Sequence, residues 1–264
     1  MNRNNPQYYD YLNVPVGLCL YSLQNKKTNQ VRIFLYLKSV SSNGYLQKNN
    51  LVFQSAANQL KICSKTLRTH LKWLIDQGWL IPDTVANSFR IIGFYSLTEK
   101  LGFTSTTGAL LYKDKILRYK SFAVAAVIAY QLERIRVRQW QTKAGLKKGS
   151  PNLSGLPSYS SMPHSYLAKT LKLSKTTACK YRKLTVENEF LTCEKSFEYM
   201  GFACKHFKTL KEYYSDNPES LRKMGKQIYR QLPDKVESKV YLRTKINIKP
   251  VCQKNRLGKN PNLF

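Results

Sequence analysis

Acidic residues are scarce in this chain. Only 15 Asp and Glu stand against 44 Lys and Arg among 264 residues, which gives a formal net charge of +29. A chain with so few anions cannot neutralise its own cations, so it favours a polyanionic partner. Because the cations are spread along the whole chain, we expect folded domains to carry them. Nucleic acid is the first candidate partner and an anionic membrane surface the second.

Long hydrophobic runs are also missing. The longest is FAVAAVIAY at 122–130, and a membrane-spanning helix needs roughly 18 or more apolar residues. The apolar segment 14–21 is short and follows a polar start, so no secretory signal is expected. We therefore expect a cytoplasmic, nucleoid-associated protein without a membrane partner. Hydrophobic residues still make up 42% of the chain, enough for one large core or two ordinary ones.

The residue patterns of enzymes and metal sites are absent as well. The six cysteines form no C-x-x-C pair, and Cys193, Cys204 and His206 lack the close ligand pairs of a zinc finger. The chain has no His-x-His pair, no phosphate-binding G-x-x-x-x-G-K-[ST] loop and no close trio of carboxylates for two-metal chemistry. We expect reduced thiols, no metal, no cofactor and no enzymatic activity.

The most informative segment is 53–80, FQSAANQLKICSKTLRTHLKWLIDQGWL. Its apolar positions fall into two helical groups, Ala57 with Leu60, and then Leu67, Leu71 and Leu74. The residues around Cys63 interrupt the rhythm and predict a turn. Ser64 is placed to cap the second helix, and Gly78 to end it. The pattern predicts two helices joined by a short turn, with an ordinary helical hairpin in a core as the alternative.

This segment resembles the winged helix-turn-helix family from the first helix to the Gly-Trp-Leu that leads into a strand. In that family the second helix enters the major groove and the following hairpin, the wing, touches the DNA backbone. The resemblance implies DNA contacts from Ser64, Lys65, Thr66, Arg68, Thr69 and Lys72, with Arg90 on the wing. Arg68 is the best candidate for base reading, because a guanidinium can bridge O6 and N7 of guanine. The hydroxyl residues are better suited to phosphate or water contacts, and a solvated surface is the alternative for any single residue.

A second copy of the pattern follows at 165–191, SYLAKTLKLSKTTACKYRKLTVENEFL. A shift of 111 residues lays Ala57 on Ala168, Leu60 on Leu171, Thr66 on Thr177, Lys72 on Lys183 and Leu80 on Leu191. Internal repetition is evidence independent of either copy. The candidate DNA contacts of this copy are Lys175, Thr176, Thr177, Lys180, Arg182 and Lys183.

The second copy departs from the first within its second helix. Arg182 falls where Leu71 lies and Thr185 where Leu74 lies, which leaves the facing of the helix open. One solution buries Ala178, Tyr181 and Leu184 and turns Arg182 and Lys183 outward. Glu189 replaces Gly78, so the end of this helix is less sharply marked.

The other segments complete a prediction for the whole chain. Before and around the first copy we expect a flexible arm at 1–13, an extended segment at 14–23, a helix at 31–40, a strand at 45–53, and a hairpin at 84–97 with its tip at 86–88. Between the two copies we expect a connector at 98–118, a long helix from 119 and a mobile loop at 149–163. After the second copy we expect a second wing at 192–207, a helix at 218–233 with Leu221, Met224 and Ile228 on one face, and a basic tail from 239 that begins as a strand. The expected divisions are 1–29, 30–108, 109–208 with a mobile loop at 143–163, and 209–264.

The fold class predicted is α+β and mainly helical, with two winged helix-turn-helix domains in tandem and a basic C-terminal extension. Over residues 30–208 this architecture resembles the replication initiators of theta-replicating plasmids. There each winged helix reads part of a repeated origin site, and the N-terminal one can form a dimer interface. The resemblance implies sequence-specific binding of double-stranded DNA by two reading heads, in replication of a plasmid, phage or other mobile element. Host replication proteins are further candidate partners, and the oligomeric state stays open between monomer and dimer.

Three alternatives remain at this point. A transcriptional regulator or an excision-type architectural factor would use the same two domains. A protein adaptor such as a helicase loader would use them as docking surfaces. An RNA-binding protein would satisfy the same net charge, since +29 does not distinguish one polyanion from another.

Overall fold

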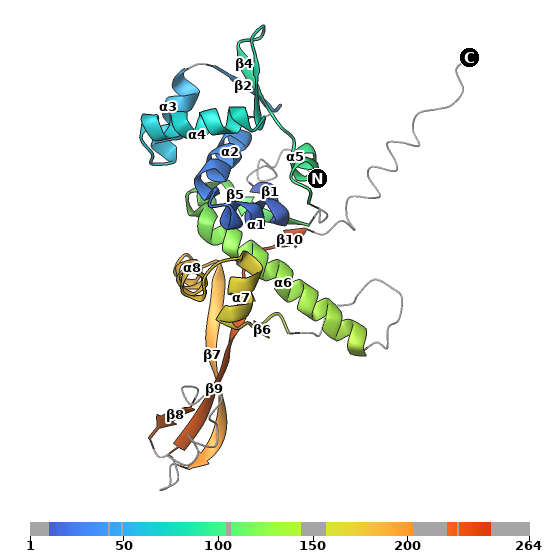
Figure 1. The fold of residues 1–264 in the computed structure, drawn as a ribbon, viewed down its shortest axis with the longest axis vertical. Coiled ribbons are helices and arrows are strands. Elements are labelled where there is room, and N and C mark those ends of the chain that lie inside the picture. The colour runs from blue at the N-terminus through green and yellow to red at the C-terminus, as the bar shows by residue number, and fades with distance from the viewer. Residues whose placement is uncertain are drawn as a thin grey trace, which may run out of the picture. The chain divides into compact units, whose positions relative to one another are not determined.

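The computed structural model describes residues 11–41, 43–48, 50–103, 107–143, 157–202, 221–225 and 227–243. These residues form helices and small antiparallel sheets, which confirms the mixed α and β composition predicted (Figure 1). The chain divides into two compact units, Met1–Tyr130 with Val240–Phe264, and Gln131–Lys239. The units part after Tyr130, whereas the sequence placed a boundary at 108.

The first unit contains the predicted pair of helices and their hairpin. After α1 (Val16–Gln24) come α2 (Thr28–Val40), β2 (Tyr45–Gln47), α3 (Asn50–Gln59), α4 (Ser64–Asp76), β3 (Leu80–Asp83) and β4 (Ser88–Ile91). The strands pair in the order β2-β4-β3, so the last strand lies in the middle. The buried side chains between helices and sheet include Phe34, Leu37, Leu67, Leu74 and Trp79. The expected strand at 45–53 is confirmed only at its start, since α3 begins at Asn50.

A second sheet of the first unit joins segments that are far apart in sequence. β5 (Gly108–Tyr112) lies between β1 (Tyr11–Pro15) and β10 (Leu242–Arg243). A Cβ at Gly108 would lie 2.0 Å from Oδ1 of Asn13, so a larger residue there would have to displace the Asn13 side chain. β10 confirms a strand at the start of the basic tail, and the rest of the tail lies outside the described residues, as do residues 1–10 of the arm.

Several sequence predictions for this unit are wrong. Residues 11–13, expected in a flexible arm, belong to β1, and residues 94–97, expected in the hairpin, begin α5 (Phe94–Lys100). Residues 16–24 form the helix α1 rather than an extended segment, because Val16, Cys19 and Leu23 recur at helical spacing on a buried face. The expected connector at 98–118 holds the end of α5 (Phe94–Lys100), β5 and the 3-10 helix η2 (Lys113–Arg118).

The long helix predicted from residue 119 is confirmed as α6 (Tyr119–Lys143). Its expected apolar face is buried at Phe122, Ala125, Ala129 and Leu132. The residues between them are buried too, from Ser121 to Ala129, so the first half of α6 is surrounded on all sides. At its start the Tyr119 hydroxyl donates to Oγ of Ser22, 3.0 Å away.

The second unit follows the latter part of α6 with β6 (Ser160–Ser161), α7 (His164–Leu171), α8 (Lys175–Glu187), β7 (Leu191–Phe202), β8 (Leu221–Met224) and β9 (Gln227–Ser238). Its strands pair in the order β6-β9-β7, and β8 also pairs with β9. β7 confirms a strand at the start of the predicted second wing, and a register shift between Tyr199 and Gly201 marks the expected bend. Residues 144–156 of the predicted mobile loop lie outside the described residues. The loop prediction is wrong at Lys143, which ends α6, and at Ser160–Ser161, which form β6 and pair with β9.

The helix predicted at 218–233 is wrong where the structure describes it, since Leu221–Met224 and Gln227–Ser238 are strands. Leu221, Met224 and Ile228 have helical spacing, but pairing of β9 along β7 overrides it. Pro233 lies at the irregularity between the Ser196–Leu232 and Glu194–Lys235 pairs, where a missing N–H does not interrupt the ladder.

The two units repeat one local geometry at a shift of 111 residues. α4 and α8 both have 13 residues. In the turns before them, Lys61 and Lys172 both have φ of 51°. The next N–H donates over the same distance in each copy, from Ile62 to the Ala57 carbonyl and from Leu173 to the Ala168 carbonyl, both 3.0 Å. The sequence repeat is therefore a repeat in backbone structure.

Candidate nucleic-acid interface

The first candidate surface is one face of α4. Ser64, Lys65, Arg68, Thr69 and Lys72 are all exposed on it. Their spacing of three and four residues puts them in one stripe, because it follows the helical repeat. The opposite side of the helix buries Leu67 and Leu74 in the core. The structure thus brings these predicted residues together as a basic and hydroxyl-bearing stripe.

The start of α4 differs from the prediction in one detail. The N-cap position is Cys63, and Ser64 is the first residue of the helix. Sγ of Cys63 lies 3.0 Å from Oγ1 of Thr66, which leaves Thr66 half-buried beside the helix start. Hydrogen bonds from the Thr66 side chain, first, and from backbone N–H groups lower the pKa of the Cys63 thiol. Thr66 is therefore engaged in the cap rather than in the exposed stripe.

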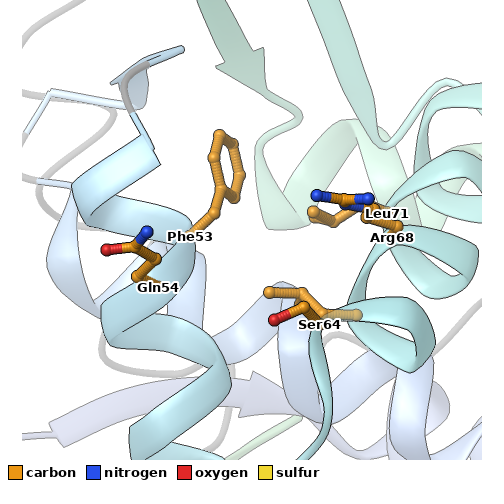
Figure 2. Close-up of a pocket in the computed structure, with 6 residues that line it drawn as sticks. Phe53, Gln54, Ser64, Arg68 and Leu71 are labelled. Atoms are coloured by element: carbon orange, nitrogen blue, oxygen red, sulfur yellow. The ribbon is translucent and has the colours of Figure 1, made fainter.

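A hollow of about 250 Å³ lies beside the stripe, between α3 and α4. Figure 2 shows Phe53 of α3 on one side of it and Arg68 and Leu71 of α4 on the other, with Ser64 below, while the amide of Gln54 points away from α4. Phe53 also packs edge-to-face on Phe89 of β4, with ring centroids 6.0 Å apart. Phe53, Leu67 and Leu71 are the apolar residues that line the hollow together with Arg68.

The predicted wing residue Arg90 is exposed on β4. Its neighbours in the sheet are Tyr45 on β2 and Ile81 on β3, and both are also exposed. The turn of the β3-β4 hairpin spans residues 84–87, close to the predicted tip. Oδ1 of Asp83 organises this turn by accepting from the N–H groups of Val85 and Ala86 at 3.1 and 3.0 Å.

The second candidate surface is the matching face of α8. Lys175, Thr176, Lys180 and Lys183 are exposed there. Ser174 caps the helix by accepting from the Thr177 N–H at 3.2 Å, and the two hydroxyls lie 2.8 Å apart. Thr177 is thus engaged in the cap, in the same way as Thr66 in the first copy.

Arg182 does not belong to this surface, and its prediction as a DNA contact is wrong. Its relative exposure is 6%, and the buried positions of α8 are Ala178, Arg182 and Thr185. Tyr181 is only half-buried and Leu184 is exposed, so the alternative facing is also wrong. The helix keeps the facing of α4, with Arg182 in the place of Leu71.

A buried charge can be accommodated at Arg182 because it is paired and hydrogen-bonded. Its Nη2 donates to the Asp234 carboxylate of β9 and lies 2.6 Å from Nε2 of His164. Its Nη1 donates to the Met162 carbonyl at 3.2 Å. A guanidinium has donors only, so Nε2 of His164 must be the acceptor in this contact. Nε2 therefore carries no proton, and the imidazole ring is neutral. Burial, first, and the Arg182 charge lower the pKa of His164, while Asp234 raises it.

Sequence reasoning missed a positive cluster beside α4. Nζ of Lys27 lies 5.1 Å from the centroid of a Trp73 ring. Burial, first, and the charges of Arg32 and Lys27 lower the pKa of His70 on α4. Nε of Arg32 is buried and has no hydrogen-bond partner among the described residues. These residues are distant in sequence, so no periodic signal could have joined them.

Comparisons of the chain with protein-family models, with curated proteins and with solved structures give no significant match. Within the described ranges, no helix is both long and apolar enough to cross a membrane. In the same part of the chain, no three His, Cys, Asp or Glu side chains are grouped to hold a metal ion.

Proposed function

We propose that this chain is a sequence-specific double-stranded DNA-binding protein with two reading heads, each a winged helix-turn-helix domain. The observation that carries the proposal is the repeat. The first unit has α2, β2, α3, α4, β3 and β4 in this order, and the second has α6, β6, α7, α8, β7 and β9, with β8 as an additional strand before β9. In both units the last of these strands lies in the middle of the sheet. Each also exposes a cationic stripe on the helix that follows the turn. Packing of an ordinary helical hairpin in a core would require neither this order of elements nor an exposed cationic stripe in both units.

In the first head, α4 enters the major groove with its exposed stripe toward the bases. Arg68 reads guanine, since its guanidinium can donate to O6 and N7 together. Lys65 and Lys72 neutralise phosphates on either side, and Arg90 on the hairpin adds a backbone contact. In the second head, Lys175, Lys180 and Lys183 of α8 have these roles, with Thr176 at the helix start. Arg182 holds α8 on its sheet and does not contact DNA.

Within this class we propose a role in replication initiation on a plasmid, phage or other mobile element. The support is the resemblance of two such domains in one basic chain to theta-plasmid initiators. Footprinting on the element's own DNA separates this role from transcriptional regulation. Protection of repeated direct sites at an origin supports initiation, and protection of one operator over a promoter contradicts it.

The decisive experiment is selection of bound duplexes from a random pool with the full chain. It is repeated with Arg68→Ala, with Lys180→Ala/Lys183→Ala, and with Lys113→Ala as a control that removes an exposed cation outside both stripes. We expect two half-sites, each lost with the variant of its own helix and both kept by the control. An unchanged motif in either head variant removes that helix from the proposal. Absence of any enriched motif overturns sequence-specific reading.

A further inference from the structure

In the second unit, the end of the sheet where β7, β8 and β9 pair has an aromatic face that the two proposed reading heads do not use. Phe197 and Tyr199 of β7 are 38% and 50% exposed. Tyr229 of β9 lies between them, with ring centroids 6.5 Å from Phe197 and 5.7 Å from Tyr199. Figure 1 shows this end of β7, β8 and β9 extending away from α7 and α8 of the same unit. Exposed apolar clusters of this kind mark interaction sites.

The strand register defines which side chains share this face. Tyr229 pairs with Tyr199 on one side and with Arg222 of β8 on the other. Directly paired residues project to the same side of a sheet, and so do residues two apart on one strand. The aromatic face is therefore made of Phe197, Tyr199, Arg222, Met224, Gln227, Tyr229 and Gln231. Among the residues that the structure describes there, it contains a cation and two amides but no carboxylate, while the opposite face holds Glu198, Lys223 and Arg230.

We propose that this aromatic face binds the unstacked bases of single-stranded nucleic acid. Aromatic rings on a sheet stack on any base, because every base has a π-face. Arg222 is exposed beside Tyr229 and can neutralise a phosphate or stack on a base. Gln227 and Gln231 can donate to and accept from base edges. A duplex keeps its bases stacked inside, so this face takes a strand that is already unpaired.

This choice of occupant rests on charge. A face with Arg222 and no carboxylate, on a chain of net charge +29, complements a polyanion with flat apolar bases. The inference stands beside the proposed duplex reading and does not depend on it. Together they describe a protein that reads paired DNA and holds an unpaired strand.

The test measures binding of the full chain to a labelled oligothymidine of about 15 nucleotides, within the range of known single-strand sites. We expect Phe197→Ala and Tyr199→Leu each to weaken binding about fivefold or more, and Tyr199→Phe to keep it. Arg222→Ser weakens binding, whereas Lys223→Ser removes the same charge from the next residue on the opposite face and leaves it unchanged. Affinity for the selected duplex stays constant in every variant, which shows that the fold is kept.

Photocrosslinking with a 5-iodouracil oligonucleotide locates the contact, and we expect crosslinks at Phe197, Tyr199 or Tyr229. An oligouridine run in parallel shows whether the strand is DNA or RNA. Unchanged binding by Tyr199→Leu, or equal losses from Arg222→Ser and Lys223→Ser, overturns the inference. If the duplex binds and single strands do not, the inference fails while the proposed function stands. If neither binds, both fail.

Discussion

Gly78 and Glu189 end α4 and α8 in the same left-handed conformation, with φ of 65° and 64°. Each N–H donates to a carbonyl three residues back, at 2.8 and 2.9 Å. The following N–H groups, of Trp79 and Phe190, then donate five residues back. One position is glycine and the other is not, so the second unit forms this turn against the steric cost of a Cβ.

Glu189→Gly should therefore stabilise the second unit by about 1 kcal/mol, because it removes that cost at a left-handed position. Glu187→Gly is the matched control, since the same change two residues earlier falls on the last residue of α8, where the backbone is helical, and should destabilise by up to about 1 kcal/mol. Urea unfolding midpoints of the two variants measure the difference. Shifts of the same sign would contradict the role of the backbone conformation.

Arg182→Met should destabilise the second unit by about 3–5 kcal/mol, because it leaves the Asp234 carboxylate without its buried partner. Arg182→Met/Asp234→Leu should recover much of this loss, since neither charge is then left alone. Lys183→Ala, on the exposed side of the same helix, is the control and should change stability by less than about 0.5 kcal/mol. Circular dichroism during denaturant unfolding measures the stability of these three variants and of the wild type. Equal stability of Arg182→Met and wild type would disprove the anchoring role.

Acidification should destabilise the second unit through His164. Its pKa is lowered in the folded chain, mainly by burial and by Arg182, so the unfolded chain binds more protons below its ordinary pKa of 6.5. Stability is then complete above that pH and falls as pH drops toward the folded pKa. His164→Gln keeps an acceptor for Arg182 but does not titrate, so its urea midpoint should depend less on pH between about 7.5 and 5.5. Identical pH profiles for the two proteins would count against this assignment.

The thiol of Cys63 should be more reactive than the thiol of Cys19. Hydrogen bonding by Thr66 and by backbone N–H groups lowers the pKa of Cys63, whereas burial raises the pKa of Cys19 to about 12. Iodoacetamide labelling followed by mass spectrometry should find Cys63 modified and Cys19 intact in the native protein. Thr66→Val should slow the labelling of Cys63 at neutral pH, because it removes the largest cause of the lowered pKa. An unchanged rate would show that Thr66 does not act on the thiol.

Binding to the selected duplex should be strongly salt-dependent. About ten phosphate contacts would give a slope near −9 for the logarithm of the association constant against that of the salt concentration. Lys65→Ala and Lys183→Ala, one on each stripe, should each make the slope shallower by about 1. Fluorescence anisotropy over a salt series measures it. A wild-type slope shallower than about −3 would contradict two heads bound together.

The sequence alone was sufficient for the parts of the fold that depend on local pattern. Leu67 and Leu74 recur at helical spacing and face the core, and Gly78 ends α4 where its left-handed conformation is needed. The same spacing one repeat later correctly placed α8. Helical periodicity and turn residues act within a few residues of themselves, so one sequence reveals them.

Tertiary structure decided what depends on distant partners. Arg182 faces inward because Asp234, 52 residues later, supplies a carboxylate there, and no pattern within α8 reveals that pairing. Leu221, Met224 and Ile228 have the spacing of a helix, yet pairing of β9 with β7 and of β8 with β9 makes this region strands. The aromatic face likewise exists only because the register sets Tyr199 opposite Tyr229. Hydrogen bonds between strands and buried ion pairs join residues far apart in the chain, so only the folded structure shows which residues they join.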